Sequence, residues 1–290
     1  MLTLEKLAAL YDVQYSKLTN MNIIRFAPYL LFSLGVCATL SGENDSISLG
    51  DTLSMPTDQI NTIMRQSAMP ELGEGRLARI LTRYYKTGFG GAENWEQISS
   101  LKVSGMIKLE SGEFKMIAYQ KKPDLFRMRI LHNERDFEMG FDGTNAWQRM
   151  PGRNTEPELM GEAEARRFIH GARFGNYLLY PYANGKKIQY IDTVPNEGNL
   201  CHHIRVTLDN EYQVDYFIDI RVYLELKSIH TDFRSGSVTS VVYKDYVQES
   251  GMPIAKQIEN FEHGEWISTL TLDDFQVNSG LMPWMFEMRQ

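Results

Sequence analysis

The sequence predicts a mainly β protein with a few helices (α+β), in which a curved antiparallel sheet forms an unclosed β-barrel covered by helices. Two observations support this fold class. From Leu101 onward, apolar and polar residues alternate with a period of two, which places them on opposite faces of a strand. Turn-forming pairs such as Ser111-Gly112 and Asp142-Gly143 separate these runs, as is typical of neighbouring antiparallel strands.

Helical spacing precedes the strands. One helix is expected from Thr57 or Asp58 to Ala68. A second is expected over residues 76–86, followed by a glycine-rich break at 88–91. A short helical turn over residues 92–97 then leads into the first strand. These helices are expected to cover the concave face of the sheet.

The first block of strands covers residues 101–147 as an up-and-down meander. Its short runs each present apolar residues to one side and charged residues to the other. The sharpest case is Phe126, Met128 and Ile130, which alternate with Arg127 and Arg129.

A helical segment over residues 156–174 interrupts the strands, within an insertion that spans 156–182. Pro157 near its start and arginines toward its end favour a helix there. The meander then resumes to give about twelve strands, over 187–194, 200–208, 212–220, 224–233, 238–246, 254–261 and 266–275. Two domains are an alternative, but a single domain over 57–290 is favoured because no linker separates the blocks.

Residues 1–41 predict a signal segment for export. Arg25 precedes an apolar run over 26–36 that is too short to span a membrane. Cleavage is expected after Ala38 or a few residues later, and translation could begin at Met21. An uncleaved anchor is the competing interpretation. The mature protein is expected to be periplasmic.

The cysteines give little support for a disulfide framework or a metal site. Only Cys37 and Cys201 occur, and Cys37 lies in the signal segment. Its context, Leu34 to Cys37, also resembles a lipidation signal, so acylation of Cys37 and anchoring to the outer membrane are an open alternative. Residues 42–56 are polar and predict a flexible leader.

Composition and motifs argue against several functions. The net charge of −7 and the absence of a concentrated basic run argue against nucleic acid as a partner. No nucleophile elbow, phosphate-binding loop or paired-histidine metal motif occurs, so neither catalysis nor a cofactor is expected. The carboxylates of the strands, such as Asp215 and Asp219, are interpreted as members of a solvated sheet face.

The positive signal is a surplus of adaptable apolar residues. The chain has 15 Met, 14 Phe, 15 Tyr and 4 Trp, and Met is over-used on surfaces that accept irregular apolar partners. Together with the curved sheet, this predicts an apolar trough under the helices. The residues expected to line it are Leu77, Leu81, Val103, Ile107, Met116, Phe126, Met128, Phe137, Met139 and Trp147.

The chain resembles the periplasmic outer-membrane lipoprotein-sorting proteins, the LolA-like lipoprotein carriers. The resemblance rests on the order and spacing of several motifs over about residues 75–286. These motifs are YYKTGFGGAENWEQISSLKVSG at 84–105, KKPDLFRMRI at 121–130, FDGTNAWQ at 141–148, and the hairpins over 186–220 and 242–259. The greater length and the insertion at 156–182 depart from the compact carriers.

This resemblance implies a helical lid and a cavity for the acyl chains of a lipid or lipoprotein, with membrane-bound donor or acceptor proteins as further partners. It places Phe126, Met128 and Trp147 on the cavity or lid side and gives Arg127 a role in loop–helix contacts. An envelope module that binds a protein partner through the same sheet is the alternative function. A hydrolase with a scattered site is a third reading.

Overall fold

The computed structural model describes residues 52–54, 74–88, 90–131, 136–149, 156–178 and 186–288. The expected signal segment, most of the expected leader and the helix expected over 57–68 lie outside the described residues. Three residues of the expected leader, Thr52–Ser54, form strand β1, which pairs with β8. Among the described residues, no helix is long and apolar enough to cross a membrane.

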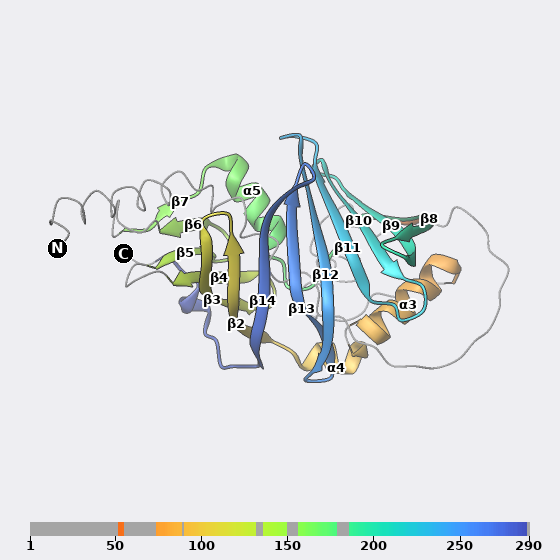
Figure 1. Cartoon of the computed structure of the whole chain (residues 1–290), viewed down its shortest axis with the longest axis horizontal. Coiled ribbons are helices and arrows are strands. Elements are labelled where there is room, and N and C mark those ends of the chain that lie inside the picture. Colours follow the sequence, from red (N-terminus) through yellow and green to blue (C-terminus); the bar gives the residue numbers. More distant parts are fainter. Residues whose placement is uncertain are drawn as a thin grey trace, which may run out of the picture.

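The described strands form one antiparallel sheet in two meanders (Figure 1). The first meander comprises β2 Ser100–Leu109, β3 Gly112–Lys121, β4 Leu125–Leu131, β5 Phe137–Phe141, β6 Ala146–Arg149 and β7 Glu158–Leu159. The second comprises β8 Lys187–Asn196, β9 Asn199–Leu208, β10 Tyr212–Asp219, β11 Glu225–Asp232, β12 Ser237–Glu249, β13 Met252–Glu262 and β14 Glu265–Val277.

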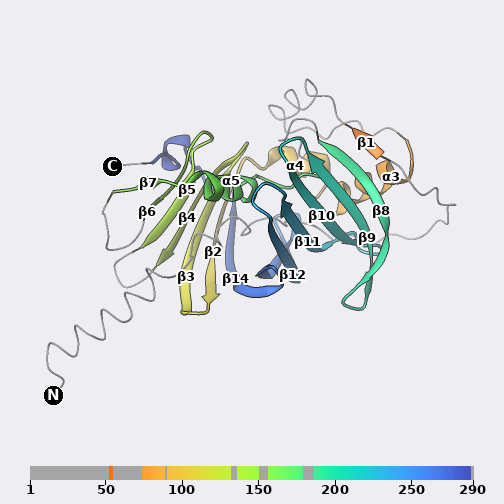
Figure 2. The same ribbon diagram turned by 90° about the horizontal axis from the view of Figure 1, so that it is seen from above.

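Pairing of β14 with β2 joins the two meanders into one sheet. A single domain over residues 57–290 stays a prediction. The sheet runs from β1 at one end to β7 at the other, without closing. Seen from above, its two halves curve away from the β14–β2 junction, and the helix at 162–171 lies between them (Figure 2). The expected fold class, an unclosed antiparallel sheet covered by helices, is confirmed.

Within the described residues, four short helical elements accompany the sheet: α3 Arg76–Gly88, α4 Gly91–Gln97, α5 Glu162–Gly171 and the 3-10 turn η3 Pro283–Met285. Helix α3 follows the expected apolar stripe, since Leu77, Ile80, Leu81 and Tyr84 are all buried. It gives way to a glycine-rich turn because Gly90 and Gly91 adopt the left-handed backbone conformation that glycine tolerates.

The helix expected over 156–174 is shorter than its pattern indicates. Glu158 and Leu159 pair instead with Gln148 and Trp147 as the edge strand β7. Glu158, an acidic residue that would favour a helix start, is therefore part of a strand. Helix α5 begins only after Gly161, whose backbone is extended.

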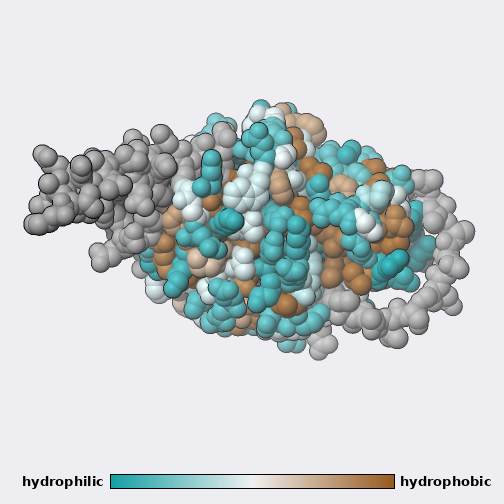
Figure 3. Space-filling model, in the orientation of Figure 1, coloured by the Kyte–Doolittle hydropathy of each residue, from teal (hydrophilic) through white to brown (hydrophobic). Residues whose placement is uncertain are grey.

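A bulge at Asp273 marks the junction of the two halves. It shifts the β14–β2 register between Leu272 and Asp274. Opposite Leu272 lies Gly105, where an added Cβ would come within 2.0 Å of the Thr271 carbonyl oxygen. Only glycine permits this approach, and bulges of this kind bend a strand. On the face seen in Figure 3, hydrophilic side chains predominate over β12–β14, while hydrophobic ones gather toward α3.

Candidate functional site

Nine of the ten residues expected to line the trough lie together in one hydrophobic core cluster. Each is at most 2% exposed. The seven on strands occupy the inner face of β2–β5, whereas Leu77 and Leu81 come from α3. The structure therefore brings these side chains into a single apolar interior, and their role in holding a ligand stays a prediction.

Trp147 is the exception, because it lies on the outer face of the sheet. It pairs with Gly140, where an added Cβ would come within 2.5 Å of its indole ring. The indole nitrogen donates a 2.9 Å hydrogen bond to the carbonyl oxygen of Phe286. Arg127 shares this face and donates to the carbonyl oxygen of Met285. Both residues hold the C-terminal segment, so Trp147 does not line the apolar interior, whereas Arg127 contacts the 3-10 turn of that segment.

Three elements cover the interior: helix α3, helix α5 and the loop 172–178 between α5 and the second meander. Phe168 of α5 packs edge-on against Phe126 of β4, with ring centroids 5.5 Å apart. The loop contributes Phe174, Tyr177 and Leu178, all fully buried. We call these three elements the cover.

Polar contacts attach the cover to the sheet, and they concentrate on β11. The inner face of this strand carries Glu225, Ser228, His230 and Asp232, each at most 2% exposed. The apolar Ile229 points the other way. The inner face of β11 is thus polar, and buried polar groups of this kind require partners.

Glu225 is the centre of the polar contacts to α3 and the loop. Its Oε2 atom accepts a 3.0 Å hydrogen bond from the hydroxyl of Tyr84 on α3 and lies 3.2 Å from the amide nitrogen of Asn176 in the loop. Burial raises the pKa of this carboxyl to about 8, although the Tyr84 and Asn176 hydrogen bonds oppose the shift. Glu225 is therefore largely protonated at neutral pH.

Helix α5 is attached farther along β11. Arg166 contacts the carboxylate of Asp232 at 3.1 Å; the Asp232 side chain is almost fully buried and that of Arg166 is 13% exposed. Arg167 of the same helix lies 3.5 Å from Glu262 of β13. Because α5 also packs on β4, it connects the two halves of the sheet.

Comparison with solved structures provides an independent view of this arrangement. A LolA superfamily protein from Nitrosomonas europaea superposes with a TM-score of 0.52 at 14% identity, covering 74% of this chain and 98% of that one. The chain has the LolA-like fold. Weaker likenesses link it to an outer membrane lipoprotein-sorting domain from Vibrio parahaemolyticus (TM-score 0.45, 12% identity, 65% and 89% covered) and a DUF1329 family protein from Desulfovibrio piger (0.48, 10%, 80% and 97%). No protein-family model and no curated protein matches the sequence.

Within this LolA-like chain, a buried row of aromatic and histidine side chains runs from the loop to β11. The Tyr177 hydroxyl lies 2.5 Å from His170 Nδ1. The His170 ring stacks on the Tyr212 ring, with the ring centroids 3.7 Å apart. The Tyr212 hydroxyl lies 3.2 Å from His230 Nδ1. Burial lowers the pKa of His230 to about 3 and holds that of His170 well below its usual range. Both rings are neutral, so the interior carries little net charge.

This row does not form a hydrolytic site. Ser228 Oγ lies 3.2 Å from His230 Nε2, as in a nucleophile–base pair, but the other ring nitrogen faces the Tyr212 hydroxyl in place of a carboxylate. Both Ser228 and His230 are sealed from solvent. In the part of the chain that the structure describes, no group of acidic, histidine or cysteine side chains is arranged to hold a metal ion.

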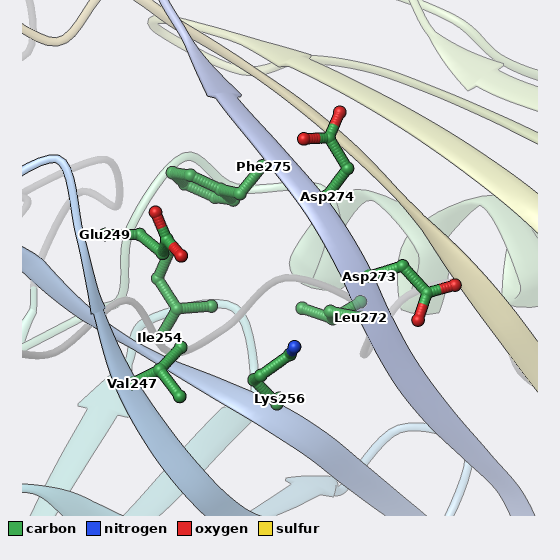
Figure 4. Close-up of a pocket in the computed structure, with 8 residues that line it drawn as sticks. All are labelled: Val247, Glu249, Ile254, Lys256, Leu272, Asp273, Asp274 and Phe275. Carbon is green, nitrogen blue, oxygen red and sulfur yellow. The ribbon is translucent and has the colours of Figure 1, made fainter.

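A small cavity opens where β13 and β14 separate. The β13–β14 ladder ends at the pair Gln257–Thr271, and below it the strands diverge toward α4. The cavity has a volume of about 70 Å³. Its lining residues are Val247, Glu249, Ile254, Lys256, Leu272, Asp273, Asp274 and Phe275. Leu272 and Phe275 point across the gap toward Ile254, while both aspartates point away (Figure 4).

This cavity is too small for a ligand, since small-molecule sites usually have volumes of about 300–1,000 Å³. Its volume is that of about two water molecules. Its floor nevertheless belongs to the interior, because Ile254 and Leu272 are members of the core cluster and Val247 and Phe275 pack against it.

The polar side of the site was missed in the sequence. Asp215 and Asp219, interpreted as solvated, are almost fully buried. Asp215 contacts His203 at 2.7 Å and Arg205 at 2.8 Å, while Asp219 accepts the backbone N–H groups that follow it. A usable signal was present in β11, where Ser228, His230 and Asp232 recur at every second residue and therefore share one face.

Proposed function

We propose that this protein is an exported, non-enzymatic carrier or receptor that holds an acyl chain of a lipid or lipoprotein between the sheet and the cover. Its role would be outer-membrane lipoprotein sorting or lipid transport in the periplasm. The observation that carries the proposal is the contrast between an apolar interior and a cover whose polar attachments concentrate on one strand, β11.

The attachments suit a reversible cover. Apolar packing alone would let the cover settle in many positions, whereas hydrogen bonds to Glu225 and Asp232 define one closed position. Each such bond contributes on the order of 1 kcal/mol net, so opening the cover breaks several modest contacts. Burial of an acyl chain gives about 0.8 kcal/mol for each methylene, so about four methylenes offset the loss of these three contacts.

Because the interior is closed, an acyl chain can enter it only by displacing the cover. The core side chains of the described residues are sealed from solvent, and the cavity between β13 and β14 is small. An acyl chain would therefore have to push the cover outward from β11. The adaptable side chains Met116, Met128 and Met139 on the inner face would repack around it.

The test is direct binding. Purified protein is extracted with organic solvent and the extract is analysed by mass spectrometry for lipid. The delipidated protein is then titrated with cis-parinaric acid, a fluorescent fatty acid. We expect co-purified lipid and saturable binding of about one probe for each chain, competed by palmitate. No lipid and no saturable binding would overturn the proposal and favour an envelope module that binds a protein.

The cover is tested with two variants of α3. Tyr84→Phe removes the hydroxyl that contacts Glu225, so probe uptake should become several-fold faster. Thr82→Ala is the matched control, because the Thr82 hydroxyl donates to Ala78 within the same helix. Equal uptake rates in the two variants would show that the cover does not control access.

A further inference from the structure

The outer face of the first meander is basic although the chain as a whole is acidic. Strand alternation places seven basic side chains on this face: Lys102, Lys108, Lys115, Lys121, Arg127, Arg129 and Arg149. The acidic residues among them are Glu113, Glu138 and Asp136, which leaves a local excess of four positive charges. The net charge of the whole chain is −7.

The lysines supply most of this excess: the four lysines exceed Glu113, which lies opposite Lys108, by three charges, and the three arginines exceed Glu138 and Asp136 by one. Glu138 contacts Arg127, Arg129 and Arg149, and Asp136 contacts Arg129, so the arginines are largely matched. In contrast, no ion pair joins any of the four lysines to a carboxylate of the described residues. Lys108 and Lys115 are the most exposed of them. Along β14 the basic face ends at Asp273 and Asp274.

The second meander has no such face. Its outer positions contain matched pairs, with Arg205 contacting Asp215 at 2.8 Å and Lys244 contacting Glu259 at 2.8 Å. The excess charge is thus a property of one half of the sheet, and it gives the molecule an oriented surface.

Exposed apolar side chains lie beside the basic face. The C-terminal segment is fixed there by the fully buried Phe286 and by hydrogen bonds from Trp147 and Arg127 to its backbone. Two apolar side chains of this segment are exposed, Met282 at 52% and Trp284 at 48%, whereas Leu281 is buried. Leu159, opposite Trp147 on β7, is 58% exposed.

We propose that this surface, the outer face of β2–β6 with the C-terminal segment, docks onto an anionic lipid bilayer. Unmatched lysines are attracted to anionic headgroups, and nearby Trp, Met and Leu side chains can enter the interfacial region. An acidic protein would satisfy the lysines but would not require apolar residues that project from the surface. The proposal does not depend on the interior holding an acyl chain, because docking is measured without transfer.

The experiment is co-sedimentation with vesicles of equal parts phosphatidylglycerol and phosphatidylcholine, compared with vesicles of phosphatidylcholine alone. Wild-type protein should bind only the anionic vesicles, and binding should weaken as salt shortens the range of the attraction. The double variant Lys108→Glu with Lys115→Glu should bind roughly thirtyfold more weakly or worse, since each lysine near an anionic surface contributes about a factor of five.

A matched control separates this face from the overall charge. Lys187→Glu with Lys227→Glu makes the same change of net charge on the outer face of the second meander. It should leave binding within about threefold of wild type. A third variant, Met282→Ser with Trp284→Ser, should weaken binding to the anionic vesicles. The salt dependence of binding should be unchanged, because no charge is removed.

Three results would overturn the proposal. They are no binding by wild-type protein, equal binding to neutral and anionic vesicles, and equal losses in the two charge-reversal variants. Binding to polyglutamate without binding to vesicles would instead assign the face to an acidic protein. Circular dichroism melts confirm that each variant is folded, and the salt titration of wild-type protein needs no variant.

Discussion

The hydroxyl of Tyr84 in α3 and the carboxyl of Glu225 in β11 meet in the interior at 3.0 Å, across 141 residues of sequence. Both side chains are almost completely buried. This contact ties helix α3 of the cover to β11, whose inner face is polar. The stability and the opening of the cover therefore depend on a small number of side chains.

Tyr84→Phe should destabilise the protein by about 1–2 kcal/mol, because Glu225 loses a buried hydrogen-bond donor. Amide exchange in α3 should accelerate more than exchange in β2–β6. The measurements are urea denaturation and hydrogen exchange followed by mass spectrometry. Thr82→Ala should leave both almost unchanged, and an unaltered exchange pattern in Tyr84→Phe would contradict the role of this contact.

Glu225 should make stability depend on pH. Its pKa is raised to about 8 in the folded protein from an ordinary value of 4.5, so the folded state binds the extra proton between these values. The free energy of unfolding should therefore fall as pH rises from about 5 to about 8, by at most about 1.4 kcal/mol for each pH unit. Above that window, this contribution is constant.

The variant Glu225→Gln isolates the effect. The buried groups His170, His230 and Lys186 have lowered pKa values. Because they are present in both proteins, their contributions to the pH dependence cancel in the difference. Urea denaturation at several pH values should show wild type losing stability relative to Glu225→Gln as pH rises. A constant difference would mean that Glu225 titrates normally.

Arg166→Ala should cost about 3 kcal/mol, because it leaves the buried carboxylate of Asp232 without its cation. Arg234→Ala is the control, since Arg234 and Glu211 form a pair whose side chains are both more than half exposed. That substitution should cost less than about 1 kcal/mol. Similar costs for both variants, measured by urea denaturation, would contradict the distinction between the two pairs.

Gly140→Ala should displace Trp147, since the new methyl group would overlap the indole ring. We expect a loss of stability of about 1–3 kcal/mol, with a change in tryptophan fluorescence and faster proteolysis of the C-terminal segment. Gly161→Ala is the control, because no atom lies within 4 Å of an added Cβ there. An unchanged fluorescence spectrum in Gly140→Ala would show that the segment does not depend on this packing.

Export is tested at the N-terminus. Mass spectrometry of protein from the periplasm should give a mature chain that begins after Ala38 or a few residues later. If Cys37 is acylated, globomycin should instead cause an unprocessed precursor to accumulate, and the mature protein should fractionate with membranes. Retention of the full chain in the cytoplasm would contradict the signal segment.

Much of the fold followed from local pattern. Alternation over residues 101–149 and 187–277 predicted most strands, and helical spacing predicted α3, because these periods depend only on which residues share a face. The helix expected at 156–174 was too long because Glu158 and Leu159 gain more from pairing with β6 than from helical capping. That competition involves a partner strand and is invisible in a local window.

For the site, alternation and helical spacing identified a set of apolar side chains that share one face, and nine of the ten gather in one core. It could not place Trp147, because alternation defines two faces without saying which is inner. Only the tertiary structure decided that β14 pairs with β2, that β11 turns its polar side inward, and that Tyr84 and Asn176 meet Glu225 there. The physical reason is that a buried polar group is stable only beside its partner, and those partners come from distant segments that packing alone brings together.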